Sequence, residues 1–196
     1  MAFAALPHSQ QVAWIVNKAN TVTIPVGDSY LQTYPDLLNG IKSLMPLNQD
    51  KLLIAGSSIF CWMPTQSRID TSLLPASLAI ITNLRAHPLT IADLQKLADT
   101  FRTIRGSSVV AASKLLHFLY PDKYAIWDSR VRVNYEYLPR NTNQTTIYIN
   151  YLNTVQALAS DGLVKKACAN LNIRINAAGY PGSLTITRLI ELCLFL

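Results

Sequence analysis

Apolar residues recur along most of the chain at spacings of three and four residues, which is the period of an amphipathic α-helix. Alternating apolar and polar residues, which mark a half-buried strand, are scarce outside the short run 21–26. The pattern therefore predicts a largely helical protein. Helices are predicted at residues 9–22, 71–84, 109–119, 147–158 and 163–171, and a closing helix from about residue 184.

Particular residues indicate where other helices begin or break. Asp28 can cap a second helix, and Pro35 should kink or restart that helix because proline lacks the backbone N–H. Thr90 and Asp93 have the spacing of a capping box at the start of a further helix. Residues 52–62 are apolar and fit either a helix or a buried strand.

The middle of the chain predicts a central helix. Gly106 breaks the chain, and residues 109–119 are then apolar on almost every side, which is typical of a helix buried all round. Asp128 is a candidate N-cap for a helix that runs to about residue 137. The chain shows no internal repeat and no clear linker. We therefore expect a single compact all-α domain over residues 1–196, divided at most into two lobes.

The composition agrees with a buried core, since 50% of the 196 residues are hydrophobic and 14% are charged. The N-terminal segment lacks the basic and apolar regions of a signal peptide, and no apolar run reaches the length of about 18 residues that a membrane span needs. Cys61, Cys168 and Cys193 form no CxxC pair, so neither a zinc site nor disulfides are predicted. We expect a cytoplasmic monomer without membrane contact, metal or cofactor.

Positive charge is concentrated in one part of the sequence. The chain carries a formal net charge of +6, which favours an anionic partner. Residues 102–140 hold seven basic and three acidic residues, so most of the excess lies in about a fifth of the chain. Such clustering suits the neutralisation of nucleic-acid phosphates. A solvated basic face without a partner is the alternative interpretation.

The richest candidate chemistry lies between Gly106 and Val131. This segment contains an apolar helix with a single lysine, Lys114, followed by a stop at Tyr120-Pro121. Asp128 then follows an apolar tripeptide, with arginines directly after it. A carboxylate presented beyond a strongly apolar run indicates a site that handles positive charge beside a bound polyanion.

This segment resembles the helix-hairpin-helix DNA glycosylases, in particular small prokaryotic members of the 8-oxoguanine DNA glycosylase-like branch. The resemblance rests on a predicted helix end at 102–104, a turn at 105–108, the phrase SKLLHFLYPDKYAIWDSRV, and the 22 positions from Gly106 to Asp128. It covers about 40 residues of the sequence. It implies the family's helical bundle, with the helix-hairpin-helix and the catalytic segment at about 90–140.

The resemblance implies an enzyme that flips a modified base out of double-stranded DNA and hydrolyses its N-glycosidic bond, leaving an abasic site. The family's catalytic aspartate matches Asp128, where it would stabilise the positive charge that develops on the deoxyribose and orient a water. A simple helix cap is the other interpretation of Asp128. DNA repair and antiviral defence against phage DNA with modified bases are both compatible with this activity.

Other roles follow from the same resemblance. The family's hairpin binds a phosphate through backbone N–H groups, and its phosphate-contacting side chain matches Arg130. The DNA-binding residues so predicted are Arg105, Gly106, Ser107, Ser108, Arg130 and Arg132. A base pocket needs groups that stack on or bond to the flipped base, and the candidates, each of which can equally belong to the core, are Trp127, Tyr124, His117, Phe60 and Trp62.

Two departures from the family leave alternatives open. Ser108 replaces the second glycine of the hairpin, and valine occupies the position where bifunctional members carry a nucleophilic lysine. Lys114 lies one turn further along, as either a displaced nucleophile or an electrostatic group, and we expect an enzyme without efficient lyase activity. Lys114 and Asp128 should then share a cleft. The alternatives are a non-catalytic helix-hairpin-helix nucleic-acid-binding module and a helical protein-interaction domain.

Overall fold

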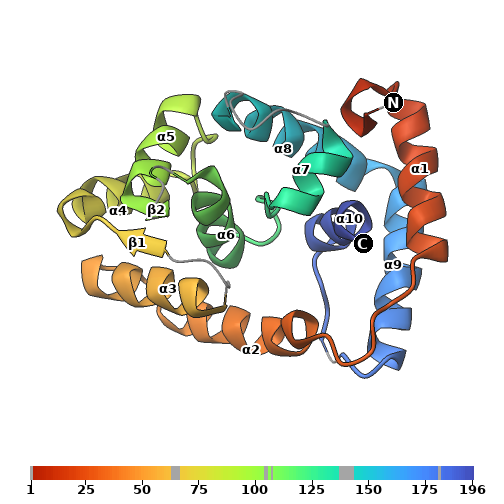
Figure 1. Cartoon of the computed structure of the whole chain (residues 1–196), viewed down its shortest axis with the longest axis horizontal. Helices are drawn as coiled ribbons and strands as arrows, with labels where there is room; N and C mark the ends of the chain where they lie inside the picture. Colours follow the sequence, from red (N-terminus) through yellow and green to blue (C-terminus); the bar gives the residue numbers. More distant parts are fainter. Residues whose placement is uncertain (1, 63–66, 104–105, 107, 137–143, 181) are drawn as a thin grey trace.

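A computed structural model describes residues 2–62, 67–103, 106, 108–136, 144–180 and 182–196, and Figure 1 shows that these are largely helical. The predicted all-α class is therefore confirmed. The α-helices are α1 (His8–Thr21), α2 (Ser29–Ser43), α3 (Gln49–Trp62), α4 (Leu74–Asn83), α5 (Ile91–Thr100), α6 (Val109–Leu119), α7 (Ser129–Tyr135), α8 (Gln144–Ser160), α9 (Gly162–Ala177) and α10 (Ile186–Phe195). Two 3-10 turns, η1 (Phe3–Ala5) and η2 (Thr71–Leu73), and two strands, β1 (Ser67–Ile69) and β2 (Phe101–Thr103), accompany them.

Side-chain caps fix the starts of several helices, because each supplies an acceptor for a backbone N–H that has no partner within the helix. Asp28 caps α2, Thr90 caps α5 and Asp128 caps α7, in agreement with the sequence. The apolar run 52–62 belongs to a helix and not to a strand. A single helix, α2, runs through Pro35, so the predicted restart at that residue does not occur.

The connection between α5 and α6 differs from the predicted hairpin. The helix expected to extend to residue 104 ends at Thr100, and the next residues form β2, which pairs antiparallel with β1. Phe101 lies opposite Ile69 in this pairing. The strand-like run 21–26, by contrast, finishes α1 and continues as irregular chain. Strand pairing here depends on a distant segment, which local periodicity does not reveal.

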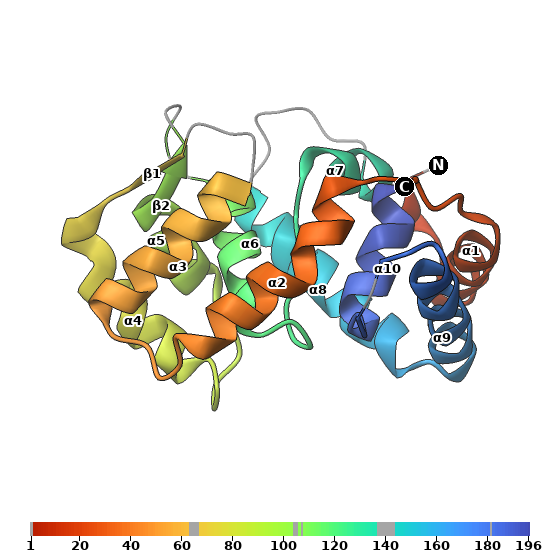
Figure 2. The same ribbon diagram turned by 90° about the horizontal axis from the view of Figure 1, so that it is seen from below.

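The helices form two groups that lie side by side in two perpendicular views (Figures 1 and 2). In the first group, α1 packs on α9, and α10 packs on α7, α8 and α9. In the second group, α2, α3 and α5 pack on α6, and α4 contacts α3 and α5. The apolar helix α6 is buried along nearly its whole length and also contacts α8, so it is central as predicted. In the described part of the chain, no helix combines the length and apolar character that a membrane span requires.

Candidate functional site

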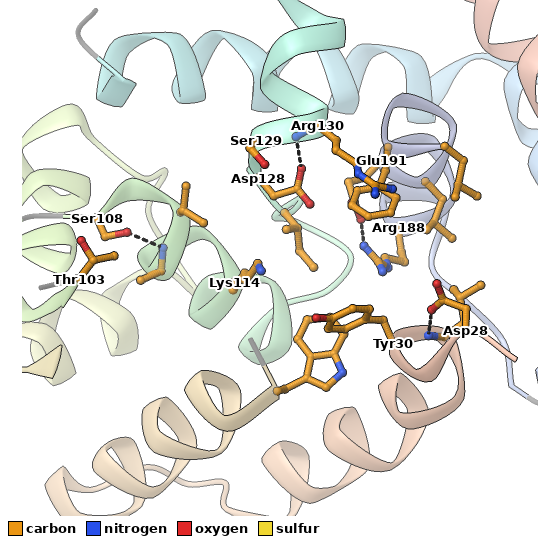
Figure 3. Close-up of a pocket in the computed structure, with 18 residues that line it drawn as sticks. Asp28, Tyr30, Thr103, Ser108, Lys114, Asp128, Ser129, Arg130, Arg188 and Glu191 are labelled. Atoms are coloured by element: carbon orange, nitrogen blue, oxygen red, sulfur yellow. Dashed lines mark hydrogen bonds and ion pairs between the residues drawn. The ribbon is translucent and has the colours of Figure 1, made fainter. Parts of the chain in front are cut away.

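A cavity of about 420 Å3 opens between the two groups of helices. Its walls come from α2, α3, β2, α6, α7 and α10, so six elements from distant parts of the chain converge on it (Figure 3). The volume is in the range of small-molecule sites, which are usually apolar pockets with a few convergent polar groups. The charged residues in its lining are Asp28, Lys114, Asp128, Arg130, Arg188 and Glu191.

Asp128 is held rigidly at the edge of this cavity. Its Oδ1 accepts hydrogen bonds from the backbone N–H groups of Arg130 and Val131, both at 2.9 Å. The preceding Trp127 is fully buried, and its backbone N–H donates to Ser113 Oγ on α6 at 3.0 Å. Oδ2 receives no hydrogen bond from the described residues, so one carboxylate oxygen serves the helix cap and the other remains available. The cap interpretation and the catalytic interpretation are therefore compatible.

Lys114 enters the same cavity from α6, which agrees with the expectation that it shares a cleft with Asp128. Burial lowers the pKa of its ammonium from 10.5 to about 8, since desolvation disfavours the charged form. The charge of Asp128 opposes this shift, and that of Arg188 adds to it. The ammonium lies over the ring of Trp62, 5.7 Å from its centroid. The site thus holds a partly desolvated cation facing a carboxylate.

Two aromatic side chains form one wall of the cavity, Tyr30 from α2 and Trp62 from α3. Their rings meet edge to face, with centroids 5.3 Å apart. Trp62 is fixed further by a hydrogen bond of 3.0 Å from its indole N–H to Thr33 Oγ1. This positioned aromatic surface can stack against a planar ligand. Trp62 is accordingly the one member of the predicted base pocket that lines the cavity.

The other predicted pocket residues lie elsewhere, which corrects the sequence-based assignment. Trp127 is fully buried and packs on Tyr151, with ring centroids 5.0 Å apart. Tyr124 is buried with its ring toward Tyr120, 6.2 Å away. Phe60 packs against Phe101 of β2 at 6.3 Å. Aromatic residues on buried elements contribute mainly to the core, and the local sequence does not distinguish the two environments.

His117 also belongs to the core, where it is part of a polar chain. Its Nδ1 bonds to the carbonyl oxygen of Tyr124 at 2.7 Å, and a carbonyl only accepts, so Nδ1 carries the proton. Its Nε2 is then the acceptor for the hydroxyl of Tyr34, also at 2.7 Å. Burial lowers the pKa of His117 to about 3 and keeps it neutral. These hydrogen bonds position the ring of Tyr34. The ring covers the guanidinium of Arg188, whose Cζ lies 5.1 Å from the ring centroid.

Arg188 and Glu191 of α10 are site residues that the sequence reasoning missed. They lie one turn apart, form an ion pair through Nη1 and Oε2, and are almost completely buried in the cavity lining. Burial lowers the pKa of Arg188, and the nearby Asp128 opposes that shift. The signal was present in the sequence, because these are the two charged residues in the otherwise apolar run LIELCLFL and its preceding turn.

The predicted DNA contacts of the hairpin are only partly described. Arg105 and Ser107 lie outside the described residues. The backbone N–H of Gly106 donates to Thr103 O at 3.0 Å, and that of Ser108 donates to Ala98 O at 2.9 Å. Ser108 Oγ caps α6 at Ala111 N, 3.1 Å away. These two N–H groups are thus already bonded within the protein, which counts against a phosphate contact at Gly106 and Ser108, and that role stays a prediction.

The predicted arginines of α7 have different environments. Arg130 is exposed at the cavity, where its guanidinium lies 4.9 Å from the ring centroid of Phe195. Arg132 is half-buried and does not line the cavity. Arg130 is therefore exposed and lies in the same cavity lining as Asp128, which is compatible with the predicted phosphate contact.

Comparison of the chain with protein-family models, curated proteins and solved structures found no match. The resemblance to the helix-hairpin-helix glycosylases therefore stays a prediction.

Proposed function

We propose that this protein is a DNA glycosylase that hydrolyses the N-glycosidic bond of a base flipped into the cavity between α6 and α10. The observation that carries the proposal is the arrangement of Asp128 and Lys114 across one cavity, beside the aromatic wall of Tyr30 and Trp62. A flipped base needs a surface on which to stack, and the deoxyribose attached to it needs a fixed carboxylate that stabilises its positive charge. Both are provided here on different elements of the fold.

Asp128 supplies the chemistry at the sugar. As the bond between C1′ and the base nitrogen breaks, the electron pair leaves with the base and positive charge develops on the deoxyribose. The rigid carboxylate, with Oδ1 held at 2.9 Å by two backbone N–H groups, stabilises this charge at little reorganisation cost. Oδ2 then accepts a proton from the water that attacks C1′.

Lys114 complements this carboxylate. Because the departing base carries the electron pair, a nearby ammonium stabilises the negative charge that it acquires. With a pKa of about 8, Lys114 is mostly protonated at pH 7, which suits this electrostatic role. Arg130 at the cavity mouth is placed to hold the phosphate next to the flipped nucleotide.

The experiment is excision from duplexes that carry different modified bases, with alkaline cleavage to reveal abasic sites. Asp128→Asn is the decisive variant, since asparagine is an equally good N-cap and leaves the start of α7 intact. We expect excision to be lost while affinity for DNA stays within about threefold of wild type. Retained excision by Asp128→Asn would remove this residue from catalysis. Binding without excision by the wild-type protein would instead support the non-catalytic nucleic-acid-binding module.

A second candidate is a glycosylase with lyase activity, in which Lys114 attacks C1′ as an amine. The pKa of about 8 favours this candidate, because a lysine of ordinary pKa would be almost entirely protonated near neutral pH. Borohydride trapping at pH 7 and pH 9 separates the two. We expect no substantial adduct at either pH. An adduct that increases between these values and disappears in Lys114→Ala would identify Lys114 as the nucleophile.

A further inference from the structure

The buried ion pair of Arg188 and Glu191 retains unused hydrogen-bonding capacity. The pair is made through Nη1 and Oε2, whereas Arg188 Nε and Glu191 Oε1 are buried and have no hydrogen-bond partner among the described residues. Buried polar atoms in proteins are nearly always paired. Both residues line the cavity, and Figure 3 shows the guanidinium of Arg188 directed toward the space near Lys114 and Tyr30. The cavity wall therefore contains a buried donor and a buried acceptor whose hydrogen-bonding capacity is unused.

Stability does not account for this pair. A buried ion pair often contributes no more than apolar side chains of similar volume would, because both charges lose their hydration. The surrounding residues nevertheless hold the side chain of Arg188 in one orientation. Its guanidinium is covered by the ring of Tyr34 at 5.1 Å, and the Tyr34 hydroxyl is anchored on His117 at 2.7 Å. A charged side chain that is buried at a cost in free energy and held in one orientation is typical of a binding site.

We propose, on the basis of the function proposed above, that Arg188 and Glu191 read one edge of the flipped base. Arg188 donates to a lone pair on this edge, and Glu191 accepts from the neighbouring N–H. The ligand class is a neutral planar base with an unblocked N–H beside an acceptor. In oxo bases this edge is a lactam, in which a ring N–H lies beside a carbonyl oxygen. In amino bases it is an amidine, in which an amino N–H lies beside a ring nitrogen that accepts.

The test compares bases that differ only by methyl groups on this edge. Calorimetry measures the affinity of the protein for hypoxanthine against 1-methylhypoxanthine, and for adenine against N6,N6-dimethyladenine. Loss of a hydrogen bond to a charged group corresponds to about a tenfold to hundredfold change in affinity. We expect the affinities of the unmethylated and methylated bases to differ by this ratio in one of the two pairs. The ratio in the hypoxanthine pair would indicate a lactam edge, and in the adenine pair an amidine edge.

The variants show whether the ion pair is the cause of the selectivity. Arg188→Met combined with Glu191→Leu removes both charges together, so the fold should persist. In this variant the affinity ratio should fall close to one. Glu191→Gln, which has nearly the same shape, is the second variant and should lower the same ratio at least about fivefold. Lys166→Ala, at an exposed position of α9, is the control and should leave the ratio unchanged.

The outcomes separate this inference from the proposed function. A wild-type ratio near one, an unchanged ratio in both cavity variants, or no binding of any base would overturn the inference. Excision from duplex DNA that depends on Asp128 would still support the glycosylase in each of those cases. Selective base binding without excision of any tested base would retain the reading role of Arg188 and Glu191 and refute the glycosylase.

Discussion

Replacing Lys114 by methionine should stabilise the protein at neutral pH. The ammonium is largely buried, and its pKa falls from 10.5 to about 8 in the folded state. Each pKa unit corresponds to about 1.4 kcal/mol, so carrying this charge at pH 7 costs the fold on the order of 3 kcal/mol. Methionine has a similar length and no charge. We therefore expect Lys114→Met to raise the free energy of unfolding at pH 7 by up to about 3 kcal/mol.

The pH dependence gives this prediction its specific form. Between about pH 8 and pH 10.5 the unfolded chain keeps the Lys114 proton while the folded protein releases it. Stability must rise with pH wherever the unfolded state binds more protons. The wild type should therefore gain stability relative to Lys114→Met across this range. The advantage of the variant should be complete below pH 8 and nearly absent above pH 10.5.

Urea denaturation of both proteins at several pH values from 7 to about 10.5 measures this difference. Other groups that titrate in this range are common to both proteins, so their contributions cancel in the comparison. A difference in stability that does not change with pH would refute the assignment of a desolvated ammonium. The Lys114→Met variant should also lose excision activity. That loss would show that the protein keeps the Lys114 ammonium for its function although the charge lowers the free energy of unfolding.

Three further predictions concern other parts of the molecule. Arg130→Ala should weaken binding to all DNA sequences alike and reduce the salt slope of the binding constant by about one, whereas Lys166→Ala on α9 should not; equal slopes would place Arg130 off the interface. Gly56→Ala should lower the free energy of unfolding by about 1–3 kcal/mol, because the added Cβ would lie 2.8 Å from a fully buried phenylalanine ring. Tyr34→Phe should lower it by about 1–3 kcal/mol by leaving His117 Nε2 without its donor, which thermal unfolding can check.

Much of the helical framework was predictable because it depends on local chemistry. The central helix 109–119 follows from its unbroken apolar character, and its observed bounds agree. Asp28, Thr90 and Asp128 cap their helices as expected, since an N-cap requires only a side-chain acceptor and nearby backbone N–H groups. The same locality explains why Asp128 could be recognised as a presented carboxylate.

The rest depended on contacts between distant segments. The pairing of β1 with β2 ends a helix that the sequence favours, and the bonds of Gly106 and Ser108 to their own protein follow from that connection. Likewise, Arg188 and Glu191 become site residues only because α10 packs beside α7, opposite α6 across the cavity. Charged residues within an apolar helix indicate that each has a partner in the folded protein, but the local sequence does not identify which residue or ligand that partner is.

The packing of α1 against α9 and α10 bears on how the protein folds during synthesis. Helices α2 to α6 are contiguous in the chain and can pack together soon after they are made. Among the described helices α1 is made before the others, and its apolar face packs on α9 and α10, which are made last. Until then the apolar face of α1 remains exposed, and it can associate with other chains or bind chaperones. The cavity wall that carries the ion pair is thus the last to form.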